Sequence, residues 1–149
     1  MRAVAQRVRR AEVRIDGRPV GTIGAGLLVL AAAEEGDEPA DADRLVKKIV
    51  NLRIFADPDD KMNLSVRDVG GSLLLVSQFT LMGDCRKGNR PAFVRAMAPD
   101  RARGFFESFV RKMRETGVPV ETGVFAAMMD VELVNDGPVT VILDTRREI

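Results

Sequence analysis

Two short polar segments carry the residue types that could do chemistry in this chain. The first, SQFTL over residues 77–81, follows the apolar run LLLV and places Ser77, Gln78 and Thr80 directly after it. Polar groups at the end of a buried strand are well placed to line a cleft. The same pattern also fits a plain strand end whose hydroxyl groups bond within a turn, and both interpretations are open at this point.

The lack of histidine limits the chemistry that SQFTL can perform. The chain has no histidine and one cysteine, which excludes Ser-His-Asp and Cys-His catalysis, histidine metal sites and a structural zinc site. Ser77 or Thr80 acting as a nucleophile would lack its usual base. Backbone N–H groups at the strand end could stabilise an oxyanion without any base, so a backbone site fits the composition better.

The second segment, NDGPVT over residues 135–140, interrupts what otherwise reads as one strand. Apolar and β-branched residues run up to it from Val131 and resume over 139–142. Proline has no backbone donor and is normally confined to sheet edges, strand ends or bulges. Gly137-Pro138 is therefore either a hairpin turn or a kink. A cis peptide here would present two neighbouring carbonyl groups that could hold an ammonium group.

Three weaker candidates complete the set. GDCRKGNRPAF, residues 83–93, could bind phosphate but lacks the glycine spacing of a P-loop. Cys85 has cationic neighbours that favour a thiolate, but no histidine partner. The carboxylates of Asp57, Asp59 and Asp60 have no partner at a defined spacing.

Composition indicates one domain without a strong overall charge. The 149 residues carry a formal net charge of +1, and no apolar run approaches the ~20 residues of a membrane span. The N-terminus lacks a signal-peptide pattern and the single cysteine fits a reducing compartment, so we expect a cytoplasmic protein with no membrane partner.

Two clusters of cations are either local basic patches or solvated surface. The first strands carry Arg2, Arg7, Arg9, Arg10, Arg14 and Arg18. A second cluster is Arg86, Lys87 and Arg90.

The apolar spacing predicts an α/β fold. Strands are expected over residues 3–15, 20–23, 27–33, 72–81, 125–134 and 139–144, with a short one near Val118. Helices are expected to begin at Pro39 and Pro99, and residues 55–63 to form a loop. We predict one compact domain over 1–149, of mostly antiparallel or mixed β structure with two helices packed on it.

SQFTL and NDGPVT, together with AQRVRRAEV near the N-terminus, resemble the D-aminoacyl-tRNA deacylase family. The likeness extends over essentially the whole chain, through IGAGLLVL, RKGNRPAF and TGVFAAMMDVELVNDGPVT. This sequence departs from the family pattern at Cys85, where threonine is expected, at Ala92, where serine is common, and at Ala126, where glycine is common. None of these departures touches the two motifs.

The resemblance implies hydrolysis of the ester of D-aminoacyl-tRNA, and of glycyl-tRNA as a side substrate. It implies a homodimer with the active site at the subunit interface, where a cis Gly137-Pro138 peptide of one subunit enters the site of its partner. Its carbonyl groups would hold the substrate's amino group and leave no room for an L side chain. The ribose 2′-hydroxyl would replace a side-chain base, with no metal or organic cofactor.

The resemblance also implies roles for individual residues. The amides of Phe79 and Thr80 would face the oxyanion, while Ser77 and Gln78 would position the tRNA end. Further implied site residues are Phe125 and Met129 at the adenine, Arg7 bonded to carbonyls of the Gly-Pro motif, and Asn135 and Asp136 beside it. Two alternatives are a non-catalytic module that binds the tRNA end and a small-ester hydrolase with Thr80 as nucleophile.

Overall fold

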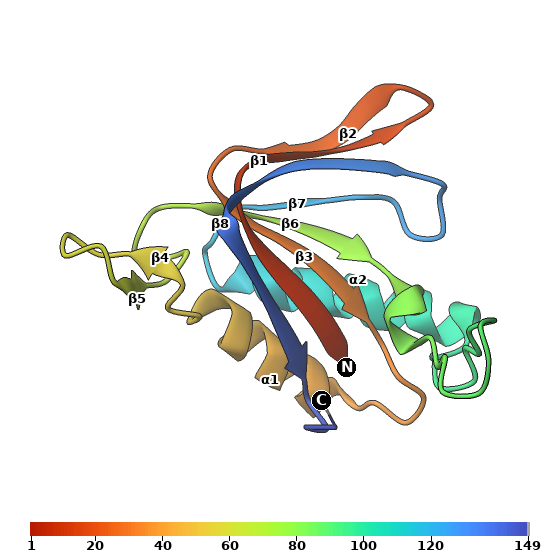
Figure 1. The fold of residues 1–149 in the computed structure, drawn as a ribbon. Helices are drawn as coiled ribbons and strands as arrows, with labels where there is room; N and C mark the ends of the chain where they lie inside the picture. The colour runs from red at the N-terminus through yellow and green to blue at the C-terminus, as the bar shows by residue number, and fades with distance from the viewer. Residues whose placement is uncertain (149) are drawn as a thin grey trace.

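A six-stranded mixed sheet backed by two helices makes up the fold in the computed structural model, which describes residues 1–148 (Figure 1). The elements in chain order are β1 (Arg2–Ile15), β2 (Arg18–Ile23), β3 (Gly26–Ala32), α1 (Pro39–Val50), β4 (Phe55–Ala56), β5 (Met62–Leu64), β6 (Ser72–Ser77), the 3-10 helix η1 (Phe79–Met82), α2 (Pro99–Glu115), β7 (Val120–Thr122) and β8 (Asp130–Asp144). The predicted fold class is confirmed.

The long strand β1 organises the sheet. One edge of β1 pairs antiparallel with β8 along almost its whole length. Its other edge is shared, with β3 beside the first half and β2 beside the second. Strands β3, β6 and β7 run parallel to one another. The strand order β2-β1-β3-β6-β7 therefore leaves β8 as the outer strand next to β1.

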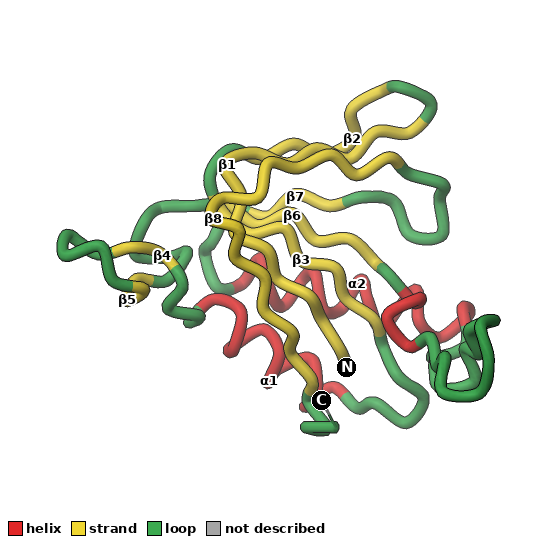
Figure 2. The backbone as a smooth tube through the Cα atoms, viewed as in Figure 1, coloured by secondary structure: helices red, strands yellow, loops and turns green. Residues whose placement is uncertain are grey.

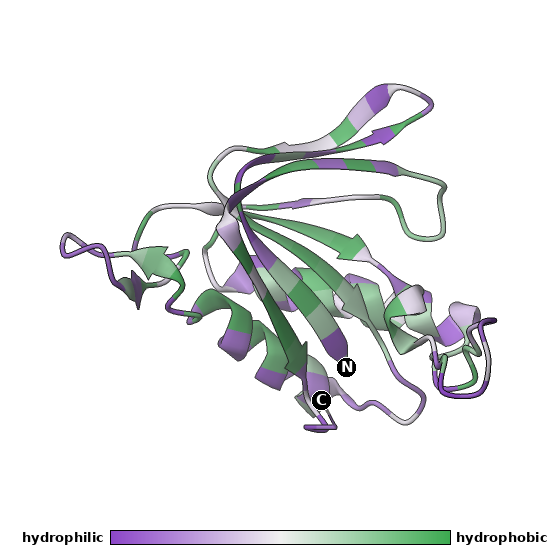
Figure 3. Ribbon diagram, viewed as in Figure 1, coloured by the Kyte–Doolittle hydropathy of each residue, from purple (hydrophilic) through white to green (hydrophobic). Residues whose placement is uncertain are grey.

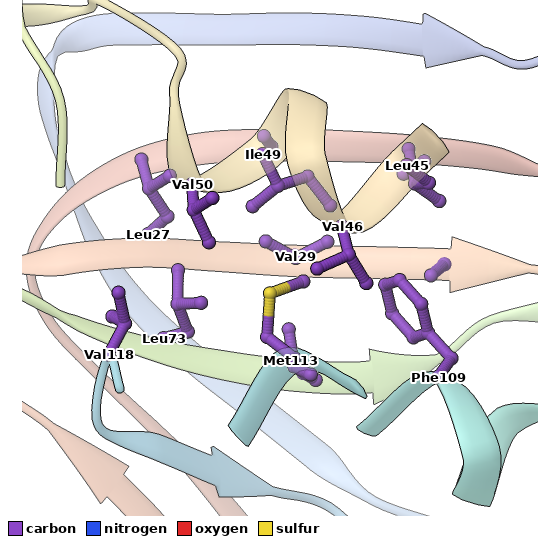
Figure 4. Packing of buried hydrophobic residues seen from close by; sticks show 14 of the residues in the cluster. Leu27, Val29, Leu45, Val46, Ile49, Val50, Leu73, Phe109, Met113 and Val118 are labelled. Atoms are coloured by element: carbon purple, nitrogen blue, oxygen red, sulfur yellow. The ribbon is translucent and has the colours of Figure 1, made fainter. Parts of the chain in front are cut away.

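The main core lies between the sheet and the helices. Apolar residues at helical spacing, such as Ile49 of α1 and Phe109 and Met113 of α2, meet Leu27 and Leu73 of the sheet (Figure 4). Each of these side chains is almost fully buried, and burial of one such side chain contributes about 1.5–3 kcal/mol.

A smaller core lies on the opposite face of the sheet. Leu28 and Leu74 alternate with the residues that face the helices and pack with Val13 and Ile23 instead. Both faces of β3 and β6 are thus covered, which explains their nearly continuous hydrophobic colour in Figure 3. None of the helices within residues 1–148 is long and apolar enough to cross a membrane.

Both predicted helices are present, and each begins at its proline. The prediction that 55–63 is only a loop is wrong, because β4 and β5 pair as a short hairpin. The turn between them is built by the Asp57 carboxylate, which accepts the amides of Asp59 and Lys61, both at 2.9 Å. This contact stabilises a tight turn that apolar spacing does not reveal.

Two predicted strands are too long. The strand over 72–81 ends at Ser77, and the chain continues as η1. The strand expected from Phe125 begins only at Asp130, because residues before it form a turn in which Ala127 donates to the Val124 carbonyl at 3.2 Å. Ala126 has a φ of 63° in this turn, a left-handed conformation that glycine adopts more readily.

Gly26 permits the close pairing of β3 with β6, and its substitution gives a test of the fold. A Cβ on Gly26 would lie 1.8 Å from the Ser72 carbonyl oxygen. We expect Gly26→Ala to lower the free energy of unfolding by about 3 kcal/mol and the Tm by roughly 6–12 °C. Gly24→Ala is the matched control, since a Cβ there meets no atom within 4 Å. Equal melting temperatures for the two variants would contradict this account of the pairing.

Candidate active site

The carboxyl ends of the parallel strands bring two separate loops to one edge of the sheet. Ser77 at the end of β6 lies beside Ala31 of β3, and Leu75 lies beside Thr122 of β7. The Gly123 amide then donates to the Leu75 carbonyl at 3.2 Å. The segment SQFTL and the loop over residues 123–129 therefore leave the sheet side by side, at the end opposite the β4–β5 hairpin (Figure 1).

Helix η1 leaves two backbone amides free. The Gln78 amide donates to the Ala31 carbonyl at 2.8 Å, and the chain then turns into η1. The first amides of a helix have no acceptor within it. In the chain as far as residue 148, the amides of Phe79 and Thr80 also have no other backbone acceptor. This pair of donors is the arrangement that an oxyanion site requires.

The Thr80 hydroxyl is not paired with a base. It is bonded to the side-chain amide of Gln78. An amide group cannot take up a proton, whichever way its oxygen and nitrogen are assigned. The geometry therefore gives Thr80 no activation as a nucleophile and leaves the backbone amides as the groups suited to chemistry here.

An exposed aromatic pair stands at η1. The Phe79 side chain is 56% exposed, and its ring packs edge to face on Phe93, with centroids 5.2 Å apart. An exposed ring of this kind can stack with a nucleobase. Phe93 is the last residue of the candidate segment 83–93, but it was given no role of its own, because nothing in its local pattern indicates a contact with Phe79.

Arg2 is a second residue that the sequence did not assign to the site. Its Nη1 donates to the Leu81 carbonyl of η1 at 3.0 Å, and its Nη2 donates to the Asp144 carboxylate at 3.3 Å. The guanidinium therefore ties η1 to the end of β8. A hollow of about 600 Å³ lies beside this contact, and its lining includes Met82 and Gly83.

Phe125 and Met129 share one loop but pack against different cores. The Phe125 ring lies 6.3 Å from the ring of Phe106 and under the guanidinium of Arg103, 4.8 Å from its carbon. Met129 packs on the smaller core, and its sulfur accepts the Val124 amide at 3.4 Å. The loop starts beside Leu75 of β6. The expected role of Phe125 and Met129 at an adenine base stays a prediction.

The Gly-Pro motif is a kink within β8. Asn135 pairs with Val8 and Thr140 with Gln6, so residues 136–139 stand opposite Arg7 alone. The strand bends outward there and then resumes its pairing with β1 (Figure 2). The hairpin-turn alternative is therefore wrong. The peptide bond between Gly137 and Pro138 is cis.

Arg7 binds the kink to β1 by hydrogen bonds, and Gly137 provides the space that the kink needs. Arg7 donates from Nε to the Asp136 carbonyl at 2.9 Å and from Nη1 to the Ile54 carbonyl at 2.6 Å. Such charge-assisted bonds are about twice as strong as neutral ones. Gly137 has a φ of 139°, and a Cβ there would lie 2.7 Å from Cγ2 of Val139. The position therefore has no room for a larger residue.

The Asn135 side chain bridges the kink from within. Its Oδ1 accepts the Val139 amide at 2.8 Å, and its Nδ2 donates to the Thr140 hydroxyl at 3.2 Å. The side chain thus replaces the backbone partners that the bulged residues lose on β1.

The two motifs do not meet within one chain. Ala3 of β1 pairs with Ala31, whose carbonyl accepts the Gln78 amide, whereas Arg7 lies at the Gly-Pro kink. Four residues of strand separate these points, a distance of about 13 Å at ~3.3 Å per residue. The strand end that leads into η1 and the Gly-Pro kink are therefore held apart along β1 in one chain.

The bridging role of Asn135 can be measured directly. We expect Asn135→Ala to speed amide exchange at Val139 about five- to tenfold, corresponding to one lost hydrogen bond of ~1 kcal/mol. In Asn135→Asp a carboxylate oxygen still accepts this amide, so exchange should stay near the wild-type rate. Unchanged protection of Val139 in the alanine variant would show that the side chain does not hold the kink.

Comparison with known proteins shows the family of the chain. A family model described as D-Tyr-tRNA(Tyr) deacylase matches residues 4–144. The D-aminoacyl-tRNA deacylases of Clostridioides difficile (strain 630) and Anaeromyxobacter dehalogenans (strain 2CP-C) are 54% and 57% identical over 147 residues, covering 99% of each chain. The solved structure of a c-Myc DNA Unwinding Element Binding Protein has a TM-score of 0.92 at 41% identity, over 97% of this chain and 98% of that one. The chain therefore belongs to the D-aminoacyl-tRNA deacylase family.

Proposed function

We propose that the protein hydrolyses the ester bond of D-aminoacyl-tRNA and releases a free D-amino acid and tRNA. The observation that carries this proposal is the pair of free amides at Phe79 and Thr80, at the end of a buried strand in a member of this family. The site offers backbone donors and no histidine, so it suits acyl chemistry that depends on oxyanion stabilisation.

In the proposed reaction, water attacks the ester carbonyl carbon and the carbonyl oxygen becomes an oxyanion. The amides of Phe79 and Thr80 stabilise this charge, and loss of one such donor typically costs 10²–10³ in kcat. The bond from carbon to the ribose oxygen then breaks, and the ribose hydroxyl leaves with a proton. The 2′-hydroxyl of the terminal adenosine handles proton transfer, while Ser77 and Gln78 position the RNA end.

Selection of the D isomer is assigned to main-chain groups of Gly137-Pro138. Their carbonyl groups accept the α-amino group of the substrate and leave no space for an L side chain. The same filter admits glycyl-tRNA, because glycine has no side chain. Arg7, Asn135 and Asp136 hold these groups in place, and Phe125 and Met129 contact the adenine.

The proposed site is completed by a second copy of the chain. The separation of about 13 Å along β1 supports insertion of Gly137-Pro138 into the site of a partner. The outer strand β8 supports such pairing, because it displays apolar side chains, including Ile142 at 61% exposure. An exposed apolar strand at a sheet edge is a common surface for association with another chain.

A paired deacylation assay tests the proposed function. D- and L-aminoacyl-tRNA with the same side chain are incubated with the protein, and the remaining ester is followed over time. We expect rapid loss of the D ester and an L ester as stable as in buffer. Equal rates would refute the chiral filter. Stability of both esters would favour a non-catalytic RNA-end binding module.

Substitution of Thr80 separates the backbone mechanism from a nucleophilic one. Thr80→Ala keeps the backbone amide, so we expect kcat on D-aminoacyl-tRNA to fall by no more than about tenfold. Ser77→Ala is the matched control for loss of a neighbouring hydroxyl group. Complete loss of activity in Thr80→Ala alone would contradict the backbone mechanism and favour the small-ester hydrolase.

A further inference from the structure

We propose that the loop over residues 84–92, here named the cationic loop, binds the backbone phosphates of the RNA nucleotides that precede the esterified adenosine. The inference rests on the proposed function, which brings an RNA 3′ end to η1. It adds the surface along which that end reaches the site.

Both ends of the cationic loop are attached to η1. Asp84 and Ala92 exchange two backbone hydrogen bonds, of 2.8 and 2.9 Å. The preceding residue, Gly83, donates its amide back into η1 at 3.0 Å, and a Cβ on it would lie 3.1 Å from the ring of Phe93. Phe93 in turn packs on Phe79. The position of the loop is therefore fixed relative to the free amides of η1.

The cationic loop presents two positive charges that no carboxylate neutralises. Its one carboxylate, Asp84, is bonded by the Arg86 guanidinium at 2.6 and 2.9 Å, which holds the pKa of Asp84 well below its usual range. Lys87 and Arg90 are exposed, and neither is ion-paired with a carboxylate of residues 1–148. Unpaired cations of this kind bind phosphate by releasing its counterions.

The other basic cluster of the sequence is largely neutralised. Arg10 and Arg14 are both paired with Glu132. The two guanidinium groups, Arg14 more than Arg10, lower the pKa of Glu132 to about 2. Arg9 lies 3.6 Å from the Asp136 carboxylate. The N-terminal arginines therefore offer less free charge to a polyanion than the cationic loop does.

The length of the loop fits the nucleotides next to the terminal adenosine. Residues 85–91 run out from the paired ends and back again, so the tip of the loop lies on the order of 10 Å from Asp84 and Ala92. A strand stacked as in a double helix rises ~3.4 Å per nucleotide, so this distance corresponds to about three stacked nucleotides. The exposed Lys87 and Arg90 thus lie in reach of the single-stranded end.

The experiment compares two D-aminoacyl esters, one on tRNA and one on adenosine without phosphate. In the double variant Lys87→Gln/Arg90→Gln we expect KM for the tRNA ester to rise about tenfold at 0.1 M salt, with kcat unchanged. The slope of log kcat/KM against log salt should become shallower by about 1.4. Hydrolysis of the adenosine ester should stay at the wild-type rate.

The control is Lys47→Gln/Lys48→Gln, which removes the same charge from exposed positions on α1. An unchanged KM for tRNA in the loop variant, an equal rise in the control, or an equal loss on the adenosine ester would overturn the proposal.

If the wild-type protein cleaves neither ester, the proposed deacylase function fails, and the role of the cationic loop is tested by RNA binding instead. Fluorescence anisotropy with an RNA hairpin that ends in unpaired ACCA should then show about tenfold weaker affinity for the loop variant; equal affinity would overturn the proposal.

Discussion

Strand β1 lies next to both motifs. Ala3 of β1 lies near the strand end that leads into η1, and Arg7 lies at the Gly137-Pro138 kink, about 13 Å further along the strand. A strand paired on both edges cannot shorten this distance. This separation within one chain is the constraint behind the proposal that the free amides and the Gly-Pro carbonyl groups of one site come from two chains. The outer position of β8, which carries the Gly-Pro kink, agrees with the proposed dimer.

Main-chain groups carry the proposed chemistry, and side chains hold those groups in place. Arg7 bonds the Asp136 carbonyl, and Asn135 bonds the Val139 amide. At the other end Arg2 bonds the Leu81 carbonyl of η1. Each contact joins residues from different strands or loops, so the packed sheet supplies the precision that the site needs. A site of this kind requires neither histidine nor a reactive hydroxyl group.

Sequence patterns were sufficient for the parts of the fold that depend on local spacing. Prolines and apolar periodicity predicted both helices, and the polar residues after LLLV and the interrupted strand marked the two motifs. The end of the strand at Ser77 was missed, because it depends on a bond between the Gln78 amide and the carbonyl of Ala31, far away in the chain. Arg2 and Phe93 were missed for the same reason, since their partners are set by tertiary packing.

A subunit-mixing experiment tests the two-chain site most directly. Gly137→Ala damages the Gly-Pro motif, and Phe79→Pro removes one of the free amides of η1. The two inactive proteins are unfolded together, refolded as a mixture and assayed on D-aminoacyl-tRNA. We predict recovery of about a quarter of the wild-type activity, because half of the dimers would be mixed and each would hold one intact site. No recovery from a mixture that contains heterodimers would contradict a site shared between chains.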